Sequence, residues 1–236
     1  MKITVINGNA RKGSTWHCKD HIVQAIAAHT AVELTEFQLP KDMPHFCTGC
    51  FNCIYQGEHK CPHSSEVSPI VAALVEADLI ILTSPVYAMD VSGQMKALLD
   101  HLCFMWLSHR PNPAMFQKIG LTISTTAGAG LGHATKTMRN SLRFWGVKRV
   151  FSYKNAVAAM KWSEVDPKKQ IRIKHDTDAL AKRIVQAIQN VHTVRKPFFR
   201  SFMFFLMKGM MAKNTWNPQD RGHWESHGWL NGVKPF

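Results

Sequence analysis

Apolar and polar positions alternate along most of the chain in a way that is typical of a layered α/β protein. Short apolar or alternating runs are followed by longer segments with apolar residues at helical spacing. Strands are expected at Lys2–Asn7, Val32–Leu39, Asp78–Thr83, Lys118–Ser124 and Lys148–Tyr153. Helices are expected at Ser14–His29, Ser65–Glu76, Ser92–Leu107, His133–Trp145 and Pro167–Val191. This alternation predicts a parallel sheet covered by helices on both faces.

The central strand supports this fold class, because Asp78–Thr83 is almost continuously apolar, as a strand buried on both faces must be. Five-stranded sheets of this doubly wound kind commonly have the flavodoxin-like strand order 2-1-3-4-5. Their ligands lie beyond the carboxyl ends of the strands. The loops after the first, third and fourth strands, at 7–15, 84–92 and 125–132, are therefore expected to form one site.

The end of the chain departs from the alternating pattern. The segment Phe198–Met211 has apolar residues on nearly every side, and such a helix must be covered by something. We expect a flavodoxin-like domain over residues 1–194. We expect a basic extension, rich in Phe, Met and Trp, over residues 195–236, docked on the core or on a second subunit.

The net charge of +13 is large, and residues 136–174 hold eleven Lys and Arg against two acids. Such an excess favours anionic partners such as phosphorylated cofactors, or it simply makes a soluble basic surface. Nucleic acid is not expected as a partner, because no nucleic-acid-binding motif accompanies the charge. No run approaches the roughly 18 to 20 apolar residues of a membrane span, and no secretory signal is seen. A cytoplasmic location is expected, with peripheral membrane contact through the tail as the alternative.

The loop between the first strand and the first helix has the composition of an anion-binding segment. Gly8–Thr15 combines small residues, hydroxyl groups and two basic side chains at the start of a helix. Backbone N–H groups and the helix dipole attract an anion at this position. A phosphate-bearing cofactor is the first hypothesis. The alternative is an ordinary turn in which Ser14 caps the helix.

The loops after the third and fourth strands add to this picture. Pro85 bends the chain out of the sheet, and Tyr87 and Met89 would then extend over a planar ligand. The small residues of Thr125–Gly130 allow a close approach of the backbone to a ligand. The glycines of Gly128–Gly132 do not form a dinucleotide fingerprint, because their spacing is wrong and they follow the fourth strand.

Together these segments resemble the NADPH-dependent FMN reductase family, in its iron–sulfur flavoprotein branch. The resemblance rests on Gly8–Thr15, Ser84–Asp100 and Thr125–Gly128, which occur in the order of the family, and more softly on the aromatic ending Asp220–Leu230. It implies an FMN cofactor, with NAD(P)H as the co-substrate. The implied phosphate site is Asn9, Arg11, Lys12, Gly13, Ser14 and Thr15. The implied isoalloxazine site is Pro85, Val86, Tyr87, Ala88 and Met89 on one edge, and Thr125, Thr126, Ala127 and Gly128 on the other. Met89 stands where relatives often carry Trp.

Four of the six cysteines lie close together in the sequence, at Cys47, Cys50, Cys53 and Cys61. Thiolates at such a spacing can wrap a soft metal or an iron–sulfur cluster. The spacing, with Pro62 after the last cysteine, resembles the compact 4Fe–4S site of iron–sulfur flavoproteins. A 4Fe–4S cluster on these four cysteines is therefore expected.

Two alternatives to a cluster stay open. Zinc accepts mixed sulfur and nitrogen ligands, and His45, His59 and His63 flank the cysteines. Metal-free thiols are the other alternative. Cys18 and Cys103 fall on expected helices, where we expect them to be buried and inert.

The resulting prediction is an FMN-dependent NAD(P)H oxidoreductase. It would pass electrons to a quinone, a flavin, a nitro compound or a redox protein. If the cysteines bind an iron–sulfur cluster, electrons would also pass through that cluster. The cofactor carries the chemistry, so no acid or base is demanded, and Tyr87 is the candidate catalytic residue because it could gate access. A non-enzymatic electron carrier or redox sensor is the alternative. A homodimer or higher homo-oligomer is expected, because relatives build flavin pockets at subunit interfaces and the tail needs a cover.

Overall fold

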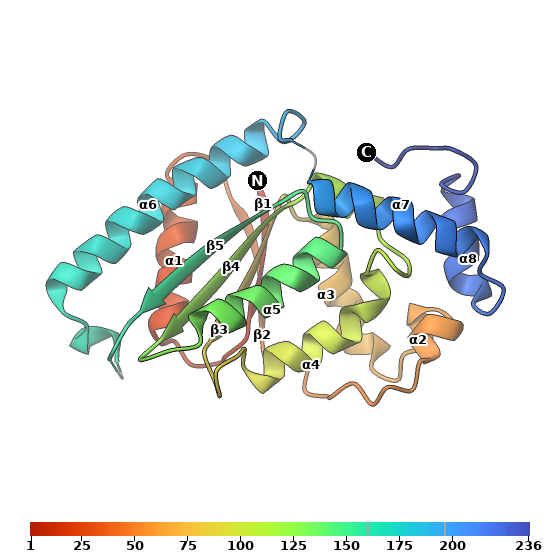
Figure 1. The fold of residues 1–236 in the computed structure, drawn as a ribbon. Helices are drawn as coiled ribbons and strands as arrows, with labels where there is room; N and C mark the ends of the chain where they lie inside the picture. Colours follow the sequence, from red (N-terminus) through yellow and green to blue (C-terminus); the bar gives the residue numbers. More distant parts are fainter. Residues whose placement is uncertain (160, 196) are drawn as a thin grey trace.

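The computed structural model describes residues 1–159, 161–195 and 197–236; residue 196 of the expected extension lies outside them. Five parallel strands form one sheet in the order β2-β1-β3-β4-β5, which confirms the predicted fold (Figure 1). The strands are β1 Lys2–Asn7, β2 Glu33–Gln38, β3 Leu79–Pro85, β4 Ile119–Thr126 and β5 Arg149–Ala156. The helices that cover them are α1 Ser14–Ala27, α3 Ser64–Glu76, α4 Gly93–His101, α5 Leu131–Phe144 and α6 Pro167–Gln189.

Helices cover both faces of the sheet because its central strands are apolar on both. In β3, every residue from Leu79 to Ser84 is buried. One face packs on α1 and α6, in a core that includes Ile22 and Ile184. The other face packs on α3, α4 and α5, in a core that includes Leu98. The edge strand β2 is the exception, since none of its residues is buried.

The helix expected over Ser92–Leu107 is shorter in the structure. It ends at His101, and the 3-10 helix Leu102–Met105 follows. Leu102, Phe104 and Met105 are nevertheless buried, so the apolar spacing reflected burial rather than a continuous helix. The cysteine-rich segment likewise contains a short helix, α2 (Asn52–Tyr55), where a loop was expected.

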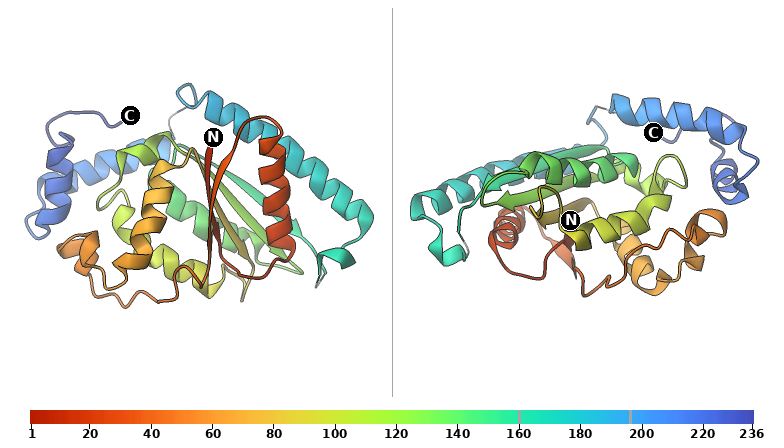
Figure 2. Two further views of the ribbon diagram at one scale, coloured as in Figure 1. Left: turned by 180° about the vertical axis from the view of Figure 1, so that it is seen from behind. Right: turned by 60° about the horizontal axis from the view of Figure 1, so that its bottom comes forward.

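The C-terminal extension forms two helices, α7 (Phe198–Ala212) and α8 (Pro218–Ser226). They lie on the same side of the molecule as α2 (Figures 1 and 2). A separate small core holds them, made of Leu107, Phe116, Phe204, Met207, Met211, Trp224 and Trp229. Because Phe116 precedes β4, the extension docks near the amino ends of the strands.

One face of α7 is exposed to solvent. It carries Phe198, Phe202, Phe205, Leu206 and Met210, with exposed fractions from 45% to 82%. The extension therefore covers only part of its apolar surface by docking on its own chain, and the second subunit expected to cover the rest stays a prediction. Among the described residues, no helix has both the length and the apolar character to cross a membrane.

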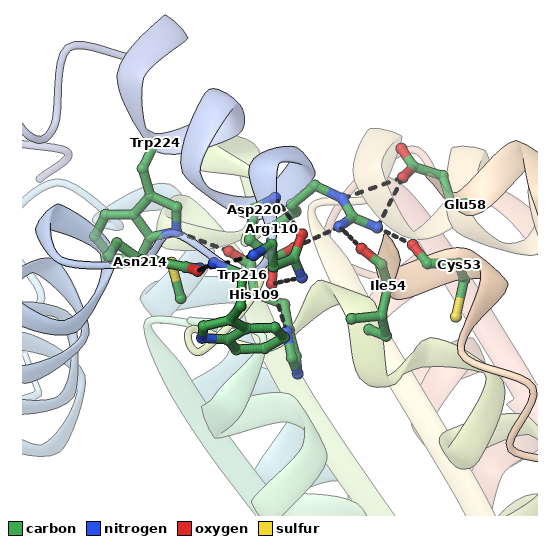
Figure 3. A network of polar contacts seen from close by, with 11 residues as sticks. Cys53, Ile54, Glu58, His109, Arg110, Asn214, Trp216, Asp220 and Trp224 are labelled. Atoms are coloured by element: carbon green, nitrogen blue, oxygen red, sulfur yellow. Dashed lines mark hydrogen bonds and ion pairs between the residues drawn. The ribbon is translucent and has the colours of Figure 1, made fainter. Parts of the chain in front are cut away.

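A buried ion network joins α8 to the cysteine-rich segment (Figure 3). The carboxylate of Asp220 is fully buried and binds Nδ1 of His109 at 2.7 Å and Nη1 of Arg110. The same guanidinium binds the carboxylate of Glu58 at 3.2 Å and donates a hydrogen bond to the carbonyl oxygen of Cys53. One arginine therefore connects the extension to the loop that carries the cysteines.

Candidate cofactor site and cysteine loop

The loops after β1, β3 and β4 meet around one cavity at the carboxyl ends of the strands. The cavity is lined by Asn9, Arg11, Gly13, Ser14, Thr15, Pro85, Val86, Tyr87, Thr125, Thr126, Ala127, Val157 and Ala159. Eleven of the fifteen residues expected from the sequence are among them. Strand order explains this, because β1 lies beside β3 and β3 lies beside β4.

Four expected residues do not line this cavity, namely Lys12, Ala88, Met89 and Gly128. The Lys12 ammonium lies over the ring of Trp16, 5.1 Å from its centroid. Met89 is 55% exposed at the tip of a turn. Sequence reasoning missed Val157 and Ala159, which follow β5. Neither has a polar side chain that would have marked it as a ligand-binding residue.

The amino end of α1 has the donors that a phosphate needs. Gly13 is the N-cap, with no side chain capping the helix, so the alternative in which Ser14 caps it is wrong. The N–H groups of the first turn have no acceptor within the helix. The hydroxyl groups of Ser14 and Thr15 and the guanidinium of Arg11 line the cavity beside them. This set of donors fits the phosphate of FMN.

Buried hydroxyl groups fix the loops relative to one another. The Ser92 hydroxyl, which is fully buried, donates to the carbonyl oxygen of Gly8, and its backbone N–H donates to the Ser84 hydroxyl at 2.8 Å. The hydroxyl groups of Thr15 and Thr125 are 2.6 Å apart. The loops after β1, β3 and β4 are therefore cross-linked below the cavity.

The turn after β3 holds Tyr87 at the rim. Two backbone hydrogen bonds between Tyr87 and Asp90, at 2.8 and 3.0 Å, close the turn. Its central residues, Ala88 and Met89, have φ values of +45° and +69°, a conformation that L-residues adopt at a cost of about 1–2 kcal/mol each. The Tyr87 hydroxyl accepts a hydrogen bond from Nδ2 of Asn9 at 2.8 Å. The strained turn and this bond together position the ring of Tyr87 over the first loop.

The four cysteines expected to bind metal lie in the segment between β2 and α3. Cys47 and Cys50 are exposed, whereas Cys53 and Cys61 are half-buried. Burial raises the pKa of the Cys61 thiol, and the neighbouring thiolates of the other three raise it further. The ionisation of Cys61 therefore depends on the charge of the other three cysteines. Four thiols in one short segment are the ligand set that an iron–sulfur cluster takes.

A fifth cysteine joins this group, which corrects the expectation that Cys103 is buried and inert. Cys103 is only half-buried and donates a hydrogen bond to Cys53. This bond, aided by the charge of Arg110, lowers the pKa of the Cys53 thiol to about 7. The same contact raises the pKa of Cys103. Cys103 reaches the loop because α4 ends before it. Cys18, by contrast, is fully buried as expected, and burial raises its pKa to about 12.

Two histidines come together with Cys61. One ligand atom each from Cys61, His63 and His101 lie within 4.8 Å of one another, and Nδ1 of His63 is 3.1 Å from Nε2 of His101. Two zinc–nitrogen bonds at a tetrahedral angle would separate such nitrogens by about 3.3 Å. Nδ1 of His101 bonds the carbonyl oxygen of Ala97 at 2.8 Å, which leaves Nε2 free to accept. Sequence reasoning named His63, but it missed His101, which lies 40 residues after Cys61.

The sheet order, with a cavity at the carboxyl ends of its strands, defines a flavodoxin-like α/β protein. The model of the NADPH-dependent FMN reductase family matches residues 1–161. The chain belongs to this family.

Curated relatives carry the name iron–sulfur flavoprotein. One from Archaeoglobus fulgidus is 28% identical over 149 residues, which are 62% of this chain and 64% of that protein. One from Methanocaldococcus jannaschii is 34% identical over 139 residues, which are 57% of this chain and 67% of that protein. The chain therefore matches about two thirds of the length of these two relatives.

Solved structures share the fold at low sequence identity. An NADH:FMN oxidoreductase in its apo form superimposes with a TM-score of 0.56 at 18% identity, over 83% of this chain and 94% of that one. An FMN-dependent NADH-azoreductase from Bacillus anthracis, solved with FMN, gives 0.60 at 11% identity, over 78% of this chain and all of that one. At such low sequence identity, these similarities show a shared fold.

Proposed function

We propose that the protein is an FMN-dependent NAD(P)H oxidoreductase that passes electrons to a quinone, a flavin, a nitro compound or a redox protein. The observation that carries this proposal is the cavity at which three loops meet beside the uncapped amino end of α1. Membership of the FMN reductase family supports it. So does the FMN named for the Bacillus anthracis azoreductase, which shares the fold.

The residues of the cavity divide into three roles. Arg11, Ser14 and Thr15 would hold the phosphate together with the N–H groups of α1. The segments 85–87 and 125–127 would hold the flavin ring between them and exclude water from one side. Tyr87, which is 47% exposed at the rim, would gate the approach of the nicotinamide. Bound FMN would supply the hydride and electron transfer itself.

Anaerobic reduction tests the activity. The purified protein is saturated with FMN and mixed with excess NADPH or NADH in a stopped-flow instrument, and we expect the visible absorbance of the bound flavin to bleach. A bound flavin that stays oxidised with both nucleotides would leave the non-enzymatic electron carrier as the function. Folded protein that takes up no FMN would overturn both.

Replacing Ser14 by alanine should weaken FMN binding about tenfold. A hydrogen bond to a charged group contributes about 1.5–3 kcal/mol, and Ser14 lines the cavity at the first turn of α1. Titration of bound-flavin fluorescence gives the dissociation constant. Ser65→Ala is the matched control, because Ser65 lies in the first turn of α3 and binds Glu66. Equal loss in both variants would contradict the assignment.

We further propose that the cysteine loop holds a 4Fe–4S cluster on Cys47, Cys50, Cys53 and Cys61. The names of the relatives support this, as does the influence of the other three cysteines on the pKa of Cys61. Such a centre would let the protein pass electrons to its acceptor one at a time. The alternative is zinc, which the positions of Cys61, His63 and His101 favour.

Two substitutions distinguish the metals. In anaerobically purified protein, Cys47→Ser should remove iron and acid-labile sulfide, whereas His63→Ala should leave both in place. Zinc would give the reverse result, with His63→Ala removing it and Cys47→Ser retaining it. His59→Ala serves as the control, because His59 lies in the same segment but outside the group of three ligand atoms. Wild-type protein without either metal would contradict the proposal and leave metal-free thiols.

A further inference from the structure

A second cavity lies at the end of β5 opposite to the cofactor site. The carboxyl end of α5, the turn into β5 and the amino end of α7 line about 430 Å³ there. These three segments lie side by side in the ribbon (Figure 1). A strand rises by about 3.3 Å per residue, and β5 has 8 residues. The two cavities are therefore roughly 25 Å apart. This cavity is not part of the flavin site, and its volume is typical of small-molecule sites.

The lining of this cavity is strongly basic. Five of its nine residues carry a positive charge and none carries a negative one; the five are Arg139, Arg143, Lys148, Arg149 and Arg200. In the described part of the chain, none of these four arginines forms an ion pair with a carboxylate. Like charges held this close repel one another. An anion in the cavity would relieve that repulsion and add an attraction.

Arg200 is the strongest indication that the cavity binds an anion. Its side chain is 1% exposed, and its Nη1 donates to the carbonyl oxygens of Phe116 at 2.7 Å and Gly146 at 3.3 Å. Its Nε and Nη2 are buried without a hydrogen-bond partner, as is Nε of Arg139. Burial lowers the pKa of Arg200 to about 10, so the group is still charged at neutral pH. Unsatisfied buried donors are unfavourable, and anionic oxygens nearby would offset this.

The rest of the lining is apolar and suits the organic part of a ligand. Val147, Val150 and Phe199 form this wall, and the guanidinium of Arg143 lies over the ring of Phe199 at 4.8 Å. One guanidinium group can donate two parallel hydrogen bonds to two oxygens of the same phosphate group. We propose that this cavity binds the phosphate group of a small organic phosphate, such as a nucleotide, at a site separate from the flavin.

Calorimetric titration of the FMN-saturated protein with ADP and with inorganic pyrophosphate tests this proposal, because bound FMN fills the first cavity. If the protein does not take up FMN, the same titration is done with the protein as purified. The proposal for this cavity can therefore be tested even if the proposed FMN-dependent function is wrong. We expect one saturable site per chain. The double variant Arg143→Gln/Arg149→Gln should weaken binding at least tenfold. Both side chains are exposed, so the fold should be unaffected.

Two further variants make the result specific. Lys174→Gln/Lys182→Gln removes the same charge from exposed positions of α6 and should leave binding unchanged. Arg200→Met replaces the buried charge with an apolar side chain of similar length and should also weaken binding at least tenfold. Absence of saturable binding, or equal affinity in all variants, would overturn the proposal. Binding only to phosphatidylglycerol vesicles, and not to ADP or pyrophosphate, would overturn it in favour of a lipid headgroup.

Discussion

Replacing Asp220 by alanine is expected to lower the free energy of unfolding by about 3–5 kcal/mol, the cost of removing one partner from a buried ion pair. The Asp220 carboxylate has no exposed surface and binds both His109 and Arg110. It also accepts a hydrogen bond from Nδ2 of Asn217 at 2.8 Å. Without it, the guanidinium of Arg110 keeps only Glu58, which is largely exposed, as a charged partner.

The same substitution should loosen the cysteine loop. Arg110 donates to the carbonyl oxygens of Cys53 and Ile54, so a displaced Arg110 would hold this part of the loop less firmly and expose its thiols. We therefore expect faster alkylation of the loop thiols by iodoacetamide in metal-free Asp220→Ala protein than in the metal-free wild type. The alkylation rate reports the accessibility of the loop thiols directly, rather than the overall stability of the protein.

Urea unfolding followed by tryptophan fluorescence measures the change in stability. Trp224 is a suitable reporter, because its Nε1 donates to the carbonyl oxygen of His109 at 2.7 Å. The matched control is Glu225→Ala, which removes a carboxylate from the exposed pair with Arg221 on the same helix. Surface pairs contribute about 0–1 kcal/mol. A similar small loss in both variants would mean that the buried network does not anchor the extension.

Replacing Gly8 by alanine is the second change with a large expected effect. A Cβ atom at this position would lie 2.7 Å from the carbonyl oxygen of Thr83 and 3.1 Å from Oγ of Ser92. Both neighbours are buried and hydrogen-bonded, so the backbone of the first loop must shift. Overpacking of this kind costs about 1–3 kcal/mol. We expect that loss of stability together with at least a tenfold weaker affinity for FMN, because the displaced loop carries the phosphate site.

Gly132→Ala is the control for this substitution. A Cβ atom at Gly132 would meet nothing within 4 Å, and the residue lies in the first turn of α5. Stability should stay the same or rise by up to about 1 kcal/mol, because alanine favours helix, and the FMN affinity should be unchanged. Unfolding curves and flavin titrations of both variants check this. Wild-type FMN affinity in the Gly8 variant would show that the first loop does not hold the cofactor.

The sequence predicted which loops surround the cavity at the carboxyl ends of the strands for a simple reason. In a parallel sheet, the loops after neighbouring strands open at one edge, so the strand order alone brings segments 9–15, 85–87 and 125–127 together. Each loop can also be recognised from a few consecutive residues: glycines and hydroxyl-bearing residues before a helix, or a proline after a strand. Met89 was placed less well, because the turn closed by Tyr87 and Asp90 carries it away from the cavity.

The cysteine loop was predictable only in part. Cys47, Cys50, Cys53 and Cys61 stand out because they are close in sequence, whereas Cys103 and His101 lie far from them along the chain. Its place on an expected helix predicts that Cys103 is buried and inert. The end of α4 at His101 redirects the next residues toward Cys53, while Phe104 and Met105 remain buried in the core.

The sequence by itself determined the layered α/β fold, the strand order and the loops that surround the cofactor cavity, since periodicity and turn residues are local properties. The tertiary structure alone decided where the C-terminal helices dock, which charges they bury with Asp220, and how Arg200 comes to lie with other arginines in a second cavity. These features depend on contacts between residues that are distant along the chain. Such contacts form only after the sheet and its helices have packed, and no local pattern records them.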